Sequence, residues 1–457
     1  MFDEIIDKEK ENIIKSVCDT IKFQSVSLED EATPGAPFGE ECKKVLEYVL
    51  DLGNKLGFRT KNIDGYCGYI EFGDGPELVG IIGHLDIVPA LEEDGWTSPP
   101  FEATIRNGKI FGRGAIDDKG PVISALYAMK SVFDSAKVSK RVRLILGLNE
   151  EKATWKCIEH YKKNEEHPTI GFSPDSDFPG IYAEKGILSV QLKHEFEMDN
   201  ITILDIDCKN NAINVVPKYC AITLKYNSEE NRREFKSISD NASKIKIEIE
   251  NIDKDTIKII SYGNAAHAAH PELGVNAITN LICYLCDDND KNGSLRKLCK
   301  LRIFDAESSE FKDESGFLTS NVAVMEYENG NIIIKINLRV PVKTSLEEIK
   351  SKYKKINTIY PDIEISFIGE QDRLYIQKDS YLVKTLVNIF NKRTNTNLDA
   401  IAIGGGTYAR AFNNFMAYGP SFPGDTDMCH QVDEFIDIDK LILATKIYAE
   451  AIYELAK

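Results

Sequence analysis

Residues 83–120 read GHLDIVPALEEDGWTSPPFEATIRNGKIFGRGAIDDKG, and the rest of the chain is interpreted outward from this stretch. It follows the apolar run LVGII at 78–82, which predicts a buried strand. His84 and Asp86 therefore lie at or just past a strand end, where α/β sheets commonly place their chemistry. In a His-x-Asp pair the carboxylate can accept a hydrogen bond from one imidazole nitrogen, which leaves the other free to bind a metal ion. Asp117 and Asp118 then follow a Gly-Arg-Gly turn, directly before a predicted helix.

Strands alternate with helices in the first part of the chain, which predicts a βαβ sheet with helices on both faces. The periodicity of apolar residues predicts helices at 10–23, 39–56, 119–133 and 154–163, and strands at 69–72, 78–84, 141–148 and 169–172. The pair Asn107-Gly108 lies between two β-like segments in 101–111 and predicts a tight hairpin.

Around Glu184 the pattern changes to strands with fewer helices, which predicts an α+β insertion. The predicted strands are 188–194, 219–226, 244–250, 256–262, 323–328, 331–340 and 363–367, and the predicted helices are 274–286, 295–304 and 345–356. From Tyr381 a long helix, a Gly-rich turn and a final helix resemble the first part again. The expected domains are therefore a catalytic domain in two parts, 1–185 and 381–457, and an inserted domain, 186–380.

The composition limits the classes of function. A chain of 457 residues is long enough for two domains with sizeable cores. Its net charge of −17 argues against non-specific binding to nucleic acid or anionic membranes. No run of 18 apolar residues is present, and the charged N-terminal segment lacks a signal-peptide core, so a membrane partner is not expected. The ten cysteines follow no disulfide framework, which favours a reduced cytoplasm.

Five candidate metal ligands lie at predicted strand ends or in loops: His84, Asp117, Glu151, Asp175 and His430. Two imidazoles and three carboxylates suit a pair of zinc or manganese ions better than one ion. With five ligands one carboxylate has to bridge, and Asp117 is the expected bridge because it follows the sharp turn at Gly114. Two ions roughly 3.5–4 Å apart can hold a water and polarise a carbonyl group.

Glu150 is the predicted general base. It is adjacent to the ligand Glu151, so it can face the reacting water without binding an ion itself. It would first accept the proton of the water and then donate it to the leaving amine.

The motifs together resemble a known superfamily, the dinuclear-metal peptidases that include ArgE, DapE and carnosinase, and most of all the PepV-type bacterial dipeptidases. The resemblance is carried, in chain order, by GHLDIVP, GWTSPPF, GRGAIDDKGP, LNEE, FSPDSDFPGIYAEKG, GNAAHAAHPELGVNA, IGGGTYARAFNNFMAYGPSFPG and HQVDEF. It implies an α/β fold: a mixed-sheet, zinc-peptidase-like catalytic domain with an inserted α+β lid domain that contains ferredoxin-like elements.

The resemblance also implies residue roles. One ion would be bound by His84, Asp117 and Asp175, and the other by Asp117, Glu151 and His430. Asp86 would orient His84.

Further roles are implied for the inserted domain and the Gly-rich loop. His267 would stabilise the oxyanion, Arg339 would bind the C-terminal carboxylate of the substrate, and Asn214 would contact the substrate. The loop with Gly405 and Gly406 would line the substrate site. The enlarged lid implies a monomer.

The expected activity is hydrolysis of short peptides by a cytoplasmic, metal-dependent dipeptidase, with zinc favoured over manganese. Two alternatives are an N-acyl amino acid deacylase of the same superfamily and a non-catalytic, metal-binding regulatory homologue.

Several individual residues keep a second interpretation. Asp118 is also a candidate helix N-cap. Asp177 is an alternative to Asp175 as a metal ligand, and His270 is an alternative to His267 as the residue that stabilises the oxyanion. Cys429 is a second possible metal ligand next to His430. The pair Cys283 and Cys286 lies in a predicted amphipathic helix and is interpreted as core rather than as a zinc or redox site.

Overall fold

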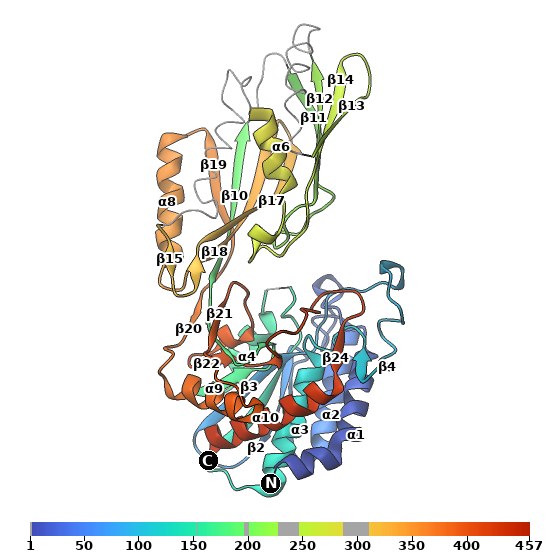
Figure 1. Cartoon of the computed structure of the whole chain (residues 1–457), viewed down its shortest axis with the longest axis vertical. Helices are drawn as coiled ribbons and strands as arrows, with labels where there is room; N and C mark the ends of the chain where they lie inside the picture. Colours follow the sequence, from blue (N-terminus) through green and yellow to red (C-terminus); the bar gives the residue numbers. More distant parts are fainter. Residues whose placement is uncertain (1, 153, 196–200, 227–245, 287–309) are drawn as a thin grey trace. The chain divides into compact units, whose positions relative to one another are not determined.

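The computed structural model describes residues 2–152, 154–195, 201–226, 246–286 and 310–457. The chain forms two compact units (Figure 1). The first contains Met1–Ala183, Leu374–Ile401 and Gly406–Lys457, and the second contains Glu184–Arg373 and Ala402–Gly405. The predicted helix at 295–304 lies outside the described residues.

The first unit is built on a mixed, nine-stranded sheet, as the predicted fold class requires. Eight strands follow the order β1-β2-β6-β3-β7-β22-β9-β20, and β21 pairs with β9. The members are β1 (Arg59–Ile63), β2 (Cys67–Phe72), β3 (Leu78–His84), β6 (Arg141–Gly147), β7 (Ile170–Ser173), β9 (Ile181–Glu184), β20 (Leu374–Tyr375), β21 (Ile401–Ile403) and β22 (Phe415–Ala417). The central strands β6, β3, β7 and β22 are parallel, and β1, β2 and β9 pair in antiparallel fashion.

Helices cover this sheet and small ribbons extend it. The helices are α1 (Phe2–Ile21), α2 (Glu40–Lys55), α3 (Lys119–Ser135), α4 (Lys156–Asn164), α9 (Tyr381–Thr394) and α10 (Ile438–Ala456). Helices α3 and α10 pack on each other and on β3 and β6, whereas α2 and α4 contact β2. A three-stranded ribbon joins β4 (Thr104–Arg106), β5 (Lys109–Phe111) and β24 (Phe435–Asp437), and β8 (Ser176–Asp177) pairs with β23 (Pro420–Ser421).

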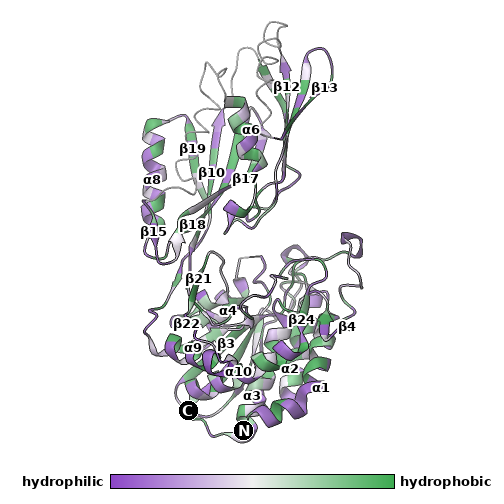
Figure 2. Cartoon of the chain, in the orientation of Figure 1, coloured by the Kyte–Doolittle hydropathy of each residue, from purple (hydrophilic) through white to green (hydrophobic). Residues whose placement is uncertain are grey.

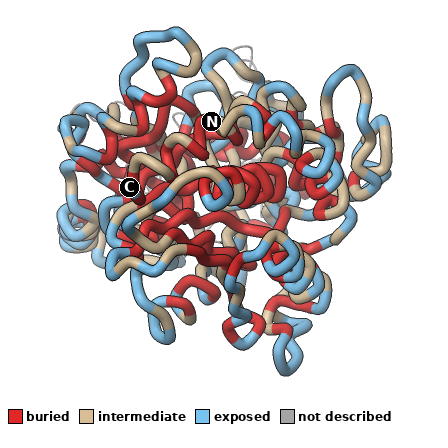
Figure 3. Tube along the Cα trace, turned by 90° about the horizontal axis from the view of Figure 1, so that it is seen from below, coloured by how far each residue is buried: buried red, intermediate tan, exposed pale blue. Residues whose placement is uncertain are grey.

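Burial explains why these segments form the core. Every residue of β3 is buried, as expected for a strand in the middle of a parallel sheet. Buried stretches of the trace gather inside and exposed loops surround them (Figure 3). The predicted hairpin at Asn107-Gly108 is confirmed, because both residues have positive φ between β4 and β5.

Among the predicted helix and strand boundaries, the start of the first helix differs most from the structure. Helix α1 begins at Phe2 rather than near residue 10, and Ile6 extends its buried face by almost two turns. The charged residues between Phe2 and residue 10 obscured this face in the sequence.

The second unit contains two four-stranded antiparallel sheets that share one hydrophobic core. One sheet has the order β17-β18-β10-β19 and the other β11-β12-β14-β13. Their strands are β10 (Gly186–Glu195), β11 (Ile201–Asp207), β12 (Tyr219–Tyr226), β13 (Ile247–Asn251), β14 (Thr256–Tyr262), β17 (Thr319–Glu328), β18 (Asn331–Val340) and β19 (Ile363–Gln371), and a short ribbon pairs β15 (Lys312–Asp313) with β16 (Gly316–Phe317).

Two helices complete the described part of this unit, α6 (Ala277–Cys286) and α8 (Leu346–Ile359). Ser345 is the N-cap of α8, since its side chain accepts a hydrogen bond from the backbone N–H of Glu348. Ile349, Tyr353 and Ile356 form the buried face of α8, whose mixed hydropathy is visible in Figure 2. Across the part of the chain that the structure describes, no helix has the length and apolar character needed to cross a membrane.

Candidate functional site

The carboxyl ends of three neighbouring parallel strands bring most of the candidate ligands together. His84 is the last residue of β3, Glu150 and Glu151 follow β6, and Asp175 follows β7. Because β3 pairs in parallel with both β6 and β7, these ends lie at the same edge of the sheet.

Asp117 lies between two histidines, one on each side of its carboxylate. His84 Nε2 is 3.0 Å from Asp117 Oδ1, and His430 Nε2 is 3.1 Å from Asp117 Oδ2. Asp175 Oδ2 is 3.7 Å from His84 Nε2, and Glu151 Oε2 is 3.1 Å from His430 Nε2. The five candidate ligands therefore form two triplets that share Asp117, and within each triplet the ligand atoms lie within 4.8 Å of one another.

This donor set fits two divalent ions. Imidazole nitrogens and carboxylate oxygens are the ligands that zinc and manganese accept, and each triplet leaves positions for water or substrate. The rival residues Asp177 and Cys429 belong to neither triplet.

The electrostatics of the cluster are those of closely packed opposite charges. Burial alone would raise the pKa of Asp117, but hydrogen bonds from His430 and His84 lower it overall. Burial opposes protonation of His430, yet its hydrogen bonds to Asp117 and Glu151 raise its pKa to about 11. In the metal-free protein the neighbouring carboxylates therefore favour the protonated form of both histidines, with which a metal ion would compete.

Glu150 is close to this cluster without belonging to either triplet. Burial raises its pKa well above the ordinary value for glutamate, and the neighbouring charge of His84 opposes that effect. Its backbone position is fixed by Asp86, whose Oδ1 accepts a hydrogen bond from Glu150 N at 3.1 Å, while Oδ2 accepts one from Glu151 N at 3.1 Å.

Asp86 also contacts His84, mainly through its backbone. His84 Nδ1 is 2.9 Å from the backbone oxygen of Asp86 and 3.5 Å from its Oδ1. The side chain of Asp86 thus serves the Glu150-Glu151 backbone more directly than the imidazole, a contact that the His-x-Asp spacing does not indicate.

Asp118 is the N-cap residue of α3, but its side chain makes no capping hydrogen bond. Its Oδ2 instead accepts a hydrogen bond from the backbone N–H of His84 at 3.1 Å. Tyr408, which sequence reasoning missed, also borders the cluster: its ring meets that of His84 edge-on at 6.2 Å, and its hydroxyl is 3.3 Å from Asn149 N.

Glu434 and Arg113 are two further residues that sequence reasoning missed. Glu434 is fully buried and accepts hydrogen bonds from the loop that carries Asp117. Its carboxylate also forms an ion pair with Arg113 Nη1 at 2.6 Å. The only hint in the sequence was the position of Glu434 in the HQVDEF motif.

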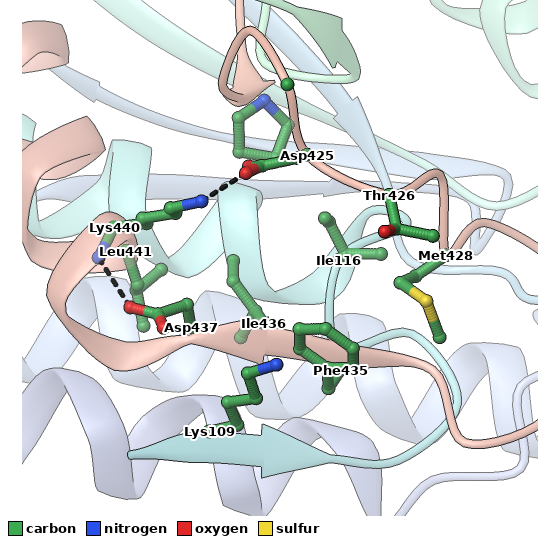
Figure 4. A pocket seen from close by; sticks show the side chains of 12 residues that line it. Lys109, Ile116, Asp425, Thr426, Met428, Phe435, Ile436, Asp437, Lys440 and Leu441 are labelled. Atoms are coloured by element: carbon green, nitrogen blue, oxygen red, sulfur yellow. Dashed lines mark hydrogen bonds and ion pairs between the residues drawn. The ribbon is translucent and has the colours of Figure 1, made fainter. Parts of the chain in front are cut away.

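A cavity of about 230 Å³ lies beside this loop and is distinct from the triplets (Figure 4). Its lining residues are Lys109, Ile116, Pro420, Gly424, Asp425, Thr426, Met428, Phe435, Ile436, Asp437, Lys440 and Leu441.

In the second unit, Arg339 is buried at the end of β18 and already has partners. Its Nε donates to Asn337 Oδ1 at 2.9 Å, and its Nη1 donates to the backbone oxygen of Gly404 at 3.0 Å. The structure thus joins Arg339 to the start of the Gly-rich loop, in which Gly405 and Gly406 are half-buried.

Asn214 and His267 lie on two adjacent segments of the same unit. A β-bridge joins Val215 to His267, and Ala268 N donates to the backbone oxygen of Asn214 at 2.8 Å. His267 is exposed and its Nδ1 accepts a hydrogen bond from Ala269 N, whereas the rival His270 contacts Glu272.

The CxxC pair is only partly described. Cys283 is half-buried in α6, and the side chain of Cys286 lies outside the described residues.

Comparison with known proteins gives a consistent result. Residues 80–454 match peptidase family M20/M25/M40. The chain is 38% identical to "Putative dipeptidase YtjP" of Bacillus subtilis over 471 positions, which cover 99% of each chain. Among solved structures, human carnosine dipeptidase 1 shares the fold with a TM-score of 0.63 at 16% identity, over 99% of this chain and 98% of that one. The dipeptidase Dug1p of Saccharomyces cerevisiae has a TM-score of 0.60 at 15% identity, over 99% and 98% of the two chains.

Proposed function

Because this chain belongs to peptidase family M20/M25/M40 and is thus a hydrolase of peptide bonds, we propose that it is a dinuclear-metal dipeptidase acting on short peptides. The observation that carries the proposal is the pair of ligand triplets sharing Asp117, with Glu150 beside them and in neither. The name of the B. subtilis relative supports the choice of dipeptides.

The residues of the two triplets would hold the ions. His84, Asp117 and Asp175 would hold one, and Asp117, Glu151 and His430 the other. Two zinc or manganese ions, when bound, supply Lewis acidity toward the peptide carbonyl and make water a better nucleophile near neutral pH. The first choice is zinc, since imidazole and carboxylate ligands are typical of its catalytic sites.

Glu150 would move the proton. A carboxyl group with a pKa raised by burial can accept a proton from the attacking water and donate it to the departing amine. Asp86 supports this role because its carboxylate accepts hydrogen bonds from the backbone N–H groups of Glu150 and Glu151. These bonds fix the backbone from which both side chains extend.

For the second unit and the Gly-rich loop we keep the roles that the family resemblance implies. His267 would stabilise the oxyanion, Arg339 would bind the substrate carboxylate, and Asn214, Gly405 and Gly406 would contact the substrate. A monomeric state is proposed on the same basis. A cytoplasmic location is proposed from the scattered cysteines, and domain borders at 185/186 and 380/381 are proposed from the change in sequence pattern.

The test is a substrate comparison with the full chain reconstituted with Zn²⁺ or Mn²⁺. We expect hydrolysis of free dipeptides, measured by amine release, with a kcat/KM above that for N-acetyl amino acids. A preference for the acetylated compounds would make the protein a deacylase. Metal binding without turnover of either class would make it a regulatory homologue.

A further inference from the structure

Both carboxylate oxygens of Glu434 are occupied by the loop that leads into Asp117. Oε2 accepts hydrogen bonds from Gly114 N at 3.1 Å and from Arg113 Nη1 at 2.6 Å. Oε1 accepts them from Ile116 N at 2.9 Å and Asp117 N at 3.3 Å. Glu434 is 0% exposed, and burying a carboxylate without hydrogen-bond partners costs much free energy. The four donors offset this cost by replacing the water molecules that the carboxylate loses on burial.

The loop depends on these contacts, because packing does not hold it on every side. Ile116 lines the cavity of about 230 Å³ in Figure 4, so open space lies next to the loop. Gly114 adds conformational freedom, since its φ of 86° lies in the left-handed region.

The segment that carries Glu434 also carries His430. Glu434 is followed directly by β24, which pairs with β5, and its backbone oxygen accepts a hydrogen bond from Gly112 N at 2.9 Å. Asp433 anchors the same segment by accepting hydrogen bonds from the N–H and hydroxyl of Thr97. One short segment therefore supplies His430 and fixes the backbone of Asp117, two ligands of the same triplet.

We propose that Glu434 is a positioning residue of the metal centre, which holds Asp117 so that its two carboxylate oxygens face His84 and His430. The proposal rests on the dinuclear centre of the proposed function. Its distinctive consequence is that Glu434 sets metal affinity although it does not bind an ion.

The test is calorimetric titration of the metal-free full-length chain with Zn²⁺ or Mn²⁺. For Glu434→Gln we expect the dissociation constant of at least one ion to rise about 10- to 100-fold, the usual cost of losing a group that orients a ligand. Turnover should recover in part at high metal concentration. The matched control is Glu159→Gln, an exposed glutamate on α4, which should titrate as the wild type does.

Two further measurements separate this role from general stabilisation. Circular dichroism and the Tm of the metal-free variant report the fold, and a purely structural role would lower Tm while leaving the dissociation constants within twofold of wild type. If Glu434→Gln does not fold, Arg113→Gln removes one partner of Oε2 and should weaken metal binding by a smaller factor. Unchanged metal affinity in a folded variant overturns the proposal, whereas a wild-type chain that binds no divalent ion overturns the centre itself.

A different observation, in the second unit, concerns two cysteines. Cys208 directly follows β11, and Cys220 lies on the antiparallel neighbour β12. Because Asp207 pairs with Ala221, the next positions along the two chains, Cys208 and Cys220, lie opposite each other. Their sulfur atoms are 2.9 Å apart. Cys220 is fully buried, whereas Cys208 borders a cavity of about 580 Å³ together with Lys209 and Lys335.

We infer that Cys208 and Cys220 are a thiol modification site that forms a reversible disulfide with peroxide as oxidant. Cys208 gives up its proton and its thiolate attacks one peroxide oxygen; the O–O bond breaks, and the leaving hydroxide takes up a proton to become one water. The sulfur of Cys220 then attacks the sulfenic sulfur of Cys208 while the Cys220 thiol proton passes to the leaving hydroxide, so that the S–S bond forms and a second water is released. The sulfur atoms need to approach by less than about 1 Å to reach a bond length near 2.05 Å.

Two features favour Cys208 as the attacking sulfur. It borders the cavity, and the hydrogen bond between the two thiols lowers its pKa despite burial. The cavity is also lined by the carboxylates of Asp205, Asp207 and Glu326. Their negative charge offsets the stabilising effect that the nearby lysines have on a thiolate.

The test is peroxide treatment of the full chain, alkylation of the remaining thiols, and peptide mass spectrometry. We expect a cross-linked peptide containing Cys208 and Cys220, released by dithiothreitol and absent in Cys220→Ala. Cys283→Ala, which changes a half-buried cysteine of the same unit, should keep the cross-link. Persistence of both free thiols after other cysteines have oxidised, or a different pairing, overturns the assignment.

Discussion

The candidate metal centre of the first unit and the predicted recognition residues of the second are held in different ways. In the first unit, three ligand positions lie at or just past the ends of adjacent parallel strands, and Asp86 and Glu434 fix the backbones of Glu150, Glu151 and Asp117. In the second, Asn214 and His267 lie on loop segments joined by a β-bridge, and only Arg339 is on a strand. The sheet edge therefore positions three of the candidate metal ligands, whereas a loop-to-loop contact positions Asn214 and His267.

The contrast predicts that substitutions in the first unit change metal content, with the largest effect at the shared ligand. Asp117→Ala should lose both ions and reduce turnover to that of metal-free protein, because both triplets use Asp117. Asp175→Ala, the comparison variant, should lose one ion first. Plasma mass spectrometry of the purified proteins measures the metal content, and an Asp117→Ala protein that retains two tightly bound ions would refute the shared-ligand arrangement.

Glu150→Ala should separate chemistry from metal binding within the same unit. We expect kcat to fall about 10²- to 10⁴-fold, the usual contribution of a general base, with metal content unchanged. Glu159→Ala serves as the control for an exposed glutamate. Near-wild-type turnover in Glu150→Ala would show that another group moves the proton.

Arg339→Lys should give the reverse pattern, with an altered KM and unchanged metal content. Loss of the planar guanidinium is expected to raise KM for dipeptides about tenfold or more, since a charge-assisted hydrogen bond contributes about 1.5–3 kcal/mol. The same substitution should matter much less for dipeptide amides, which lack the carboxylate. Equal effects on acids and amides would mean that Arg339 acts only through Asn337 and Gly404.

The smallest expected effect is the dependence of metal affinity on pH. Hydrogen bonds to Asp117 and Glu151 raise the pKa of His430 to about 11 against the opposing effect of burial. A proton must therefore leave His430 when an ion binds, and apparent affinity should rise up to about tenfold per pH unit below that pKa. Calorimetry at pH 7 and 8 in buffers of different ionisation enthalpy would detect the released proton. Affinity that is independent of pH would contradict this competition.

Sequence reasoning was most informative where periodicity and chemistry coincide. The strand at 78–84, the helix that starts at Lys119 and the strand at 331–340 were predicted within two residues at each end, because each is an uninterrupted buried or amphipathic pattern. The mixed α/β fold class is confirmed as well. Short strands such as β8 and β23 were missed, since two-residue pairings leave no periodic signal.

The candidate site was predictable to the extent that its members end apolar strands. The structure brings His84, Glu151 and Asp175 together through the parallel register, which a pattern of strands implies. The contacts of Glu434 were not predictable, because they join residues more than 300 positions apart and depend on backbone N–H groups. The roles of His267 and Arg339 remain predictions that rest on family resemblance.

The position of His430 has a consequence for protein synthesis. Its triplet partners Asp117 and Glu151 are translated some 300 residues earlier, and α10, which packs against α3, is translated later still. A nascent chain consequently lacks one imidazole of the proposed centre until residue 430 has been translated. A chain whose translation stops before codon 430 would therefore carry the proposed metal centre without one of its two histidines.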